Sequence, residues 1–122
     1  MKFNIEVEIT NEQIENLIVS AFEGGSSYWM VYDVNPIIKD FKWNSSEYAA
    51  QIINGDVEIN VYDAENPDDL LGRLNTHTIL TGLKTMCKDY PTHFTDIIND
   101  NIDADTGDVF MQCAVMNDVV FG

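Results

Sequence analysis

Basic residues are scarce in this 122-residue chain, which has six Lys and Arg against 21 Asp and Glu. None of the six lies between Phe3 and Ile38 or between Asp89 and Gly122. The resulting formal charge of −15 repels nucleic acid and anionic lipid and attracts basic surfaces. We therefore expect no direct nucleic-acid binding, no membrane binding, and a basic protein as the partner.

Long apolar runs are also missing. No segment reaches the roughly 18 consecutive apolar residues of a membrane-spanning helix, and the polar–apolar alternation of residues 2–9 is unlike a secretory leader. Only two cysteines occur, Cys87 and Cys113, both within helical spacing. We expect two buried thiols in a reducing cytosol rather than a disulfide.

A folded core is nevertheless expected, because 45% of the residues are apolar and aromatic residues are frequent. Disordered acidic tails lack such residues. The length suits one domain over residues 1–122, and a domain of this size buries roughly two-thirds of the surface that its unfolded chain exposes.

The first 25 residues carry two periodic patterns. Residues 2–9 alternate, which predicts a half-buried strand with Glu6 and Glu8 on its acidic outer face. Thr10 and Gln13 then form a capping-box pattern at the start of an amphipathic helix. Gly24 and Gly25 are expected to end that helix.

The dipeptide Asn54-Gly55 lies between two runs rich in β-branched and aromatic residues, at 48–53 and 56–62. Because both of its residues tolerate positive φ, it is the strongest short signal for a β-hairpin. We therefore predict a two-residue hairpin at Asn54-Gly55. A broken alternation over residues 37–43 predicts a further strand.

The second half of the chain is mostly helical in pattern. Residues 63–73 are expected to form a loop, and apolar spacing predicts a helix that begins at Asn75 or Thr76 and ends before Pro91. Shorter patterns predict helices over 92–99 and 105–116 and a brief edge strand over 119–121. The fold class is therefore α+β: a small antiparallel sheet including the Asn54-Gly55 hairpin, with about three helices packed on one face.

The acidic segment 96–108 invites a calcium hypothesis, but started at Asp103 it places Asp108 where a calcium loop needs glycine. Acidic residues at a helix start, which complement the helix dipole, explain it more simply. The two histidines and two cysteines lack the paired spacing of a zinc site, and no nucleophile motif is present. We therefore expect no metal, no cofactor and no enzymatic activity.

The most distinctive string is EGGSSYW at residues 23–29, and it allows two interpretations. Its glycine and serine backbone could bind a small ligand on which the aromatic rings stack. Alternatively, the glycines end the helix and the aromatic residues close the core, so that Trp29 is buried. The candidate ligand-binding residues are Glu23, Gly24, Gly25, Ser26, Tyr28 and Trp29.

This string, together with DADTGDVFMQCAVMNDVVFG at the other end, resembles a family of small uncharacterised tailed-phage and prophage proteins. The resemblance includes Gly82-Leu83 and extends to Gly122. It departs at Gly107, where the family pattern has Ala, and at residues 116–118. It implies a phage-encoded protein in the cytoplasm of a bacterial host, with no known activity.

The leading functional hypothesis is a DNA mimic or anti-defence inhibitor that blocks a basic, nucleic-acid-binding surface of a host protein. Duplex DNA carries one charge per roughly 1.7 Å, and its binding proteins match that array with Lys and Arg. The candidate partner-binding residues are Glu6, Glu8, Asp100, Asp103, Asp105 and Asp108. The alternative is a sponge for a nucleotide-like defence signal that uses residues 23–29. A homodimer is compatible with either hypothesis.

Overall fold

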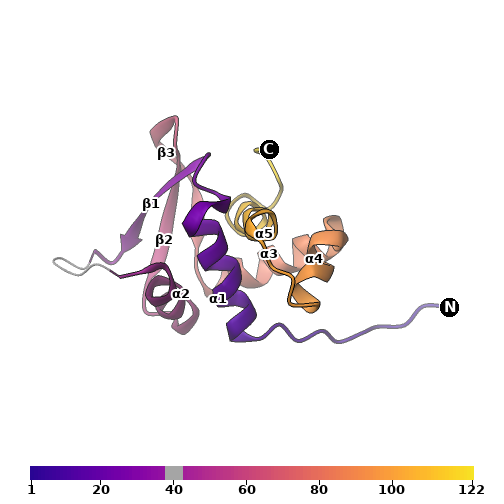
Figure 1. Ribbon diagram of the computed structural model, residues 1–122. Helices are drawn as coiled ribbons and strands as arrows, with labels where there is room; N and C mark the ends of the chain where they lie inside the picture. Colours follow the sequence, from indigo (N-terminus) through magenta and orange to yellow (C-terminus); the bar gives the residue numbers. More distant parts are fainter. Residues whose placement is uncertain (38–42) are drawn as a thin grey trace.

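The computed structural model describes residues 1–37 and 43–122 and has the expected α+β class (Figure 1). Its elements, in chain order, are α1 (Asn11–Ser20), the π-helical turn η1 (Ala21–Gly25), β1 (Met30–Asn35), α2 (Ser45–Asn54), β2 (Glu58–Asp63), β3 (Asn66–Leu74), α3 (Thr76–Asp89), α4 (Pro91–Ile98) and α5 (Ala104–Met116). The described residues thus contain five α-helices rather than about three.

The three strands form one antiparallel sheet in the order β1-β2-β3. Strands β2 and β3 form a hairpin whose register pairs Asp63 with Asn66, so Ala64 and Glu65 make the turn. The prediction of a loop over residues 63–73 was therefore wrong. Pro67 does not prevent a strand here, because β3 is an edge strand, where the missing amide of proline is tolerated.

The predicted hairpin at Asn54-Gly55 was also wrong, because residues 45–54 form helix α2. Asn44 accepts a hydrogen bond from the Glu47 backbone N–H, and Glu47 reaches back to the Asn44 backbone N–H. This capping box starts a helix whose core side chains, Ala49 and Ile52, are three residues apart. Gly55 has a φ of 81° and is the left-handed C-cap of α2.

Replacing Gly55 by Val is therefore expected to destabilise the protein by roughly 1–2 kcal/mol, because a side chain with a branched Cβ resists the left-handed conformation. Gly55→Asn is the matched control, since Asn occupies left-handed C-caps more readily. Urea unfolding of both variants measures the difference. Equal free energies of unfolding would contradict the C-cap assignment.

The N-terminal segment, residues 1–9, does not join the sheet. It belongs to no strand, and Phe3 and Ile5 are 75% and 72% exposed. Figure 1 shows it as an extended chain that leads away from α1 past α4. The prediction of a half-buried strand was wrong for the single chain, since alternation predicts an extended conformation but supplies no neighbouring strand.

The helix predictions outside α2 are confirmed in type and position. Thr10 and Gln13 form the predicted capping box of α1, and Asn75 is the N-cap of α3. Helix α5 is the centre of the structure, packed against α1, α3, α4 and β3. It approaches α3 so closely that a Cβ on Gly82 would lie 2.6 Å from the Cα of Ala114.

Three smaller expectations have different outcomes. Cys113 is buried as expected, but Cys87 is exposed. Residues 119–121 form no strand. The strand expected over 37–43 lies largely outside the described residues. None of the helices in the described part of the chain is long and apolar enough to cross a membrane.

Candidate functional site

The Asp108 carboxylate, on α5, is the centre of a hydrogen-bond network. Its Oδ1 accepts from the Ser26 hydroxyl at 2.8 Å and from the Trp29 indole N–H at 2.7 Å. Its Oδ2 accepts from the Tyr28 hydroxyl at 2.7 Å and from the Gln112 amide at 3.2 Å. Four donors therefore occupy this carboxylate, and three of them come from the EGGSSYW string.

Desolvation and the bond to Asp108 raise the pKa of Tyr28 to about 12. The Tyr28 hydroxyl therefore keeps its proton and remains a donor to Asp108 at neutral pH. Gln112 extends the network to the C-terminal tail, because its Oε1 accepts from the backbone N–H groups of Val120 and Phe121. The Phe121 ring in turn stacks on Trp29, with ring centroids 5.2 Å apart.

Glycines allow the same two segments to approach closely. A Cβ on Gly25 would lie 2.5 Å from the Ala104 carbonyl oxygen, and a Cβ on Gly107 would lie 2.8 Å from the Ser20 Cβ. Alanine at position 107 would thus require α1 and α5 to separate slightly. The two blocks that carry the family resemblance therefore meet in space as one packed, hydrogen-bonded contact.

This contact favours the structural interpretation of residues 23–29. Trp29 is 2% exposed, which confirms the prediction that it is buried, and Ser26 is fully buried. The side-chain donors of Ser26, Tyr28 and Trp29 all bind Asp108. In this arrangement they are not available to a ligand.

Asp108→Asn is expected to lower the free energy of unfolding by about 3 kcal/mol, because hydrogen bonds to a charged group contribute roughly 1.5–3 kcal/mol each. The amide nitrogen that replaces Oδ2 cannot accept the hydrogen bonds from Tyr28 and Gln112. The matched control is Asp105→Asn, an exposed residue in the first turn of the same helix. Chemical unfolding followed by tryptophan fluorescence measures both, and equal losses would contradict the role of Asp108.

Trp29→Ala is expected to cost about 3–5 kcal/mol, as for other buried large aromatic residues. Trp29→Phe should cost less, since it keeps an aromatic ring against Phe121 and loses the hydrogen bond to Asp108. Thermal and urea unfolding compare the two variants. A stable Trp29→Ala protein that had lost a small-molecule ligand would instead support a ligand site.

The exposed carboxylates of the predicted partner site occupy two places. Asp100, Asp103 and Asp105 lie on the connection from α4 to α5 and on the first turn of α5. Hydrogen bonds from the backbone N–H and hydroxyl of Thr106 lower the pKa of Asp103, which stays ionised. Glu6 and Glu8 lie on the N-terminal segment, and Asp108 faces the network described above. The structure therefore separates Asp108 from the other five.

Few of the carboxylates in the described residues form ion pairs with Lys or Arg. In residues 1–37 and 43–122 there is one ion pair, between Arg73 and Glu58, with 3.7 Å between Arg73 Nε and Glu58 Oε1. No other Asp or Glu in these two ranges has a cationic partner from the same ranges within ion-pair distance.

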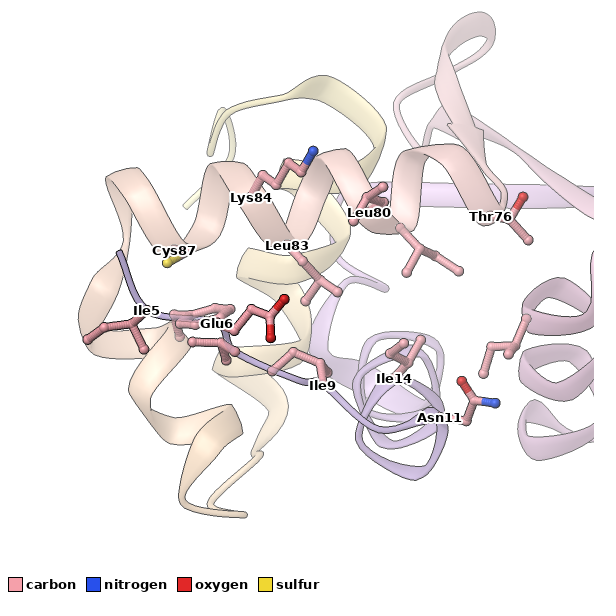
Figure 2. Close-up of a pocket in the computed structure, with 14 residues that line it drawn as sticks. Ile5, Glu6, Ile9, Asn11, Ile14, Thr76, Leu80, Leu83, Lys84 and Cys87 are labelled. Atoms are coloured by element: carbon pink, nitrogen blue, oxygen red, sulfur yellow. The ribbon is translucent and has the colours of Figure 1, made fainter. Parts of the chain in front are cut away.

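An apolar groove of about 620 Å³ lies between the N-terminal segment and helices α1, α2, α3 and α4. Figure 2 shows Ile9 and Ile14 on one side of it and Leu80 and Leu83 on the other. The groove was not predicted from the sequence, because the residues that line it come from five different segments. Glu6 and Lys84 are the charged residues in its lining.

Within the described chain, no group of three or more His, Cys, Asp or Glu residues is placed to hold a metal ion. No family model, no curated protein and no solved structure matches this chain.

Proposed function

We propose that this protein is a non-enzymatic binding protein whose acidic surface occupies a basic, nucleic-acid-binding surface of a bacterial host protein. The resemblance to phage proteins suggests a host defence or nucleic-acid-handling protein as the partner. The observation that carries the proposal is that residues 1–37 and 43–122 contain one ion pair, in a chain with a charge of −15.

Unpaired carboxylates raise the free energy of the free protein through mutual repulsion. A basic partner relieves that repulsion on binding, and complementary charge also accelerates the encounter. Carboxylates already paired within the chain would contribute neither effect. The surface therefore has the electrostatic properties of a ligand for a basic groove.

The segment from Asp100 to Asp105 is the part of this surface best suited to the role. It is held in place from both sides: the Gln13 amide donates to Asp100 Oδ1 at 3.1 Å, and Asp103 caps α5. Fixed carboxylates lose less conformational entropy on binding than mobile ones do.

The triple variant Asp100→Asn, Asp103→Asn, Asp105→Asn tests this segment. Asn suits the left-handed backbone of Asp100, whose φ is 56°, and remains an N-cap residue at position 103, so folding should be retained. Binding to a basic host protein should weaken about tenfold, because exposed ion pairs contribute up to about 1 kcal/mol each. Basic proteins are captured from bacterial lysate with the unmodified protein, and those that duplex DNA displaces are kept. The measurement is the affinity of each of these proteins for the triple variant and for the unmodified protein.

The matched control changes the same charge elsewhere: Glu65→Gln, Asp68→Asn and Asp69→Asn, on the β2–β3 hairpin at the other end of the molecule (Figure 1). Binding should depend on the α5 segment more than on the hairpin, and added salt should weaken it. If both triple variants bind as the unmodified protein does, the charge serves only to solvate the surface.

The alternative, a ligand site at residues 23–29, uses backbone N–H groups of this segment and the faces of its aromatic rings. The Ser26 N–H already donates to the Ala21 carbonyl, and Trp29 is 2% exposed and stacks on Phe121, so both would have to move when the ligand binds. The basic-surface hypothesis needs no such rearrangement.

A further inference from the structure

The backbone of the N-terminal segment has no hydrogen-bond partner in the described chain. No hydrogen bond joins a backbone N–H or C=O of residues 1–9 to any other described residue. An extended chain with unpaired groups of this kind is a template for pairing with another strand. The first residue with a backbone hydrogen bond to another described residue is Thr10, which caps α1.

The side chains of this segment are those of a strand with one covered face. Phe3, Ile5, Val7 and Ile9 alternate with polar residues. Ile5, Val7 and Ile9 line the apolar groove, yet Ile5 is still 72% exposed, so the body covers this face incompletely (Figure 2). Exposed, contiguous apolar surface of this kind marks an interaction site.

We propose that this segment pairs with the same segment of a second copy of the chain, as a two-stranded antiparallel ribbon around a two-fold axis at Ile5. Such an axis makes the contact self-complementary, and it places the apolar faces of both segments on the same side, over the two grooves. The pairing uses the backbone groups that have no hydrogen-bond partner among the described residues of the single chain.

Charge favours this register. With Ile5 opposite Ile5, Lys2 of each copy lies opposite Glu8 of the other, and residues in such pairs are close enough for their charges to attract. Moving the axis by one residue toward α1 would place Glu6 opposite Glu6. Moving it the other way, to Asn4, would place Lys2 opposite Glu6 instead of Glu8, so reversing the charge of Glu8 distinguishes that register from the proposed one.

The same register explains the exposure of Phe3. Phe3 is 75% exposed in the single chain. In the ribbon it lies opposite Val7 of the second copy, a residue that lines that copy's groove. Each Phe3 would therefore cover apolar surface of the other molecule.

Two charge reversals test the register directly. Lys2→Glu places Glu opposite Glu8, and Glu8→Lys places Lys opposite Lys2, so each variant alone should dimerise about tenfold more weakly. An equimolar mixture should form a heterodimer at near-original affinity, because both opposed pairs are again of opposite charge. Sedimentation equilibrium of the full chain, with one variant fluorescently labelled, measures both.

Lys88→Glu and Glu12→Lys are the matched controls, since they make the same charge changes at exposed positions on α3 and α1. Neither should alter the pairing of the ribbon, and mixing them should produce no rescue. Added salt should strengthen the dimer, because it screens the repulsion between two chains of charge −15.

Ile5→Glu brings two carboxylates together at the axis and should abolish the dimer, whereas Ile37→Glu, at another highly exposed isoleucine, should not. Two results overturn the proposal. One is an unmodified protein with a dimer dissociation constant weaker than about 1 mM. The other is a dimer that survives Ile5→Glu or that shows no rescue in the mixture of charge-reversed variants.

Discussion

The hydrogen bonds to the Asp108 carboxylate hold the segment after α1 and the C-terminal tail against α5. Ser26, Tyr28 and Trp29 reach it from the segment after α1, and Gln112 links it to the C-terminal tail. A partly buried carboxylate costs free energy unless its acceptors are filled, and here four donors fill them. The network thereby determines where η1, the start of β1 and the last residues lie around α5.

The carboxylates of this chain therefore have two different roles. Asp108 acts within the fold, whereas Asp100 and Asp105 are exposed and form no ion pair with another described residue. Equal formal charge does not mean equal function, because solvent and neighbouring donors decide what each carboxylate can bind. The proposed surface for a basic partner and the proposed strand for a second copy lie on different segments. They can coexist, since they share only Glu6 and Glu8.

The sequence predicted an element correctly where the residues that specify it lie within one short segment. The capping box at Thr10, the helix start at Asn75 or Thr76 and the apolar spacing of α3 and α5 were readable in the sequence, and the helices lie there. The capping box from Asn44 to Glu47 was equally readable and would have predicted α2. It was outweighed by Asn54-Gly55, because a glycine with positive φ serves a hairpin turn and a helix C-cap alike.

The sequence by itself determined the charge of −15, the exclusion of a long apolar span, the α+β class and most helix positions, since these depend on composition or on neighbours within a few residues. Only the tertiary structure decided that Asp108 binds Trp29, that β3 replaces an expected loop, and that no strand of the described residues pairs with residues 1–9. Each of these is a contact between distant segments or the lack of one. Alternation and charge show what a segment can pair with, but only the packed chain shows whether a partner is there.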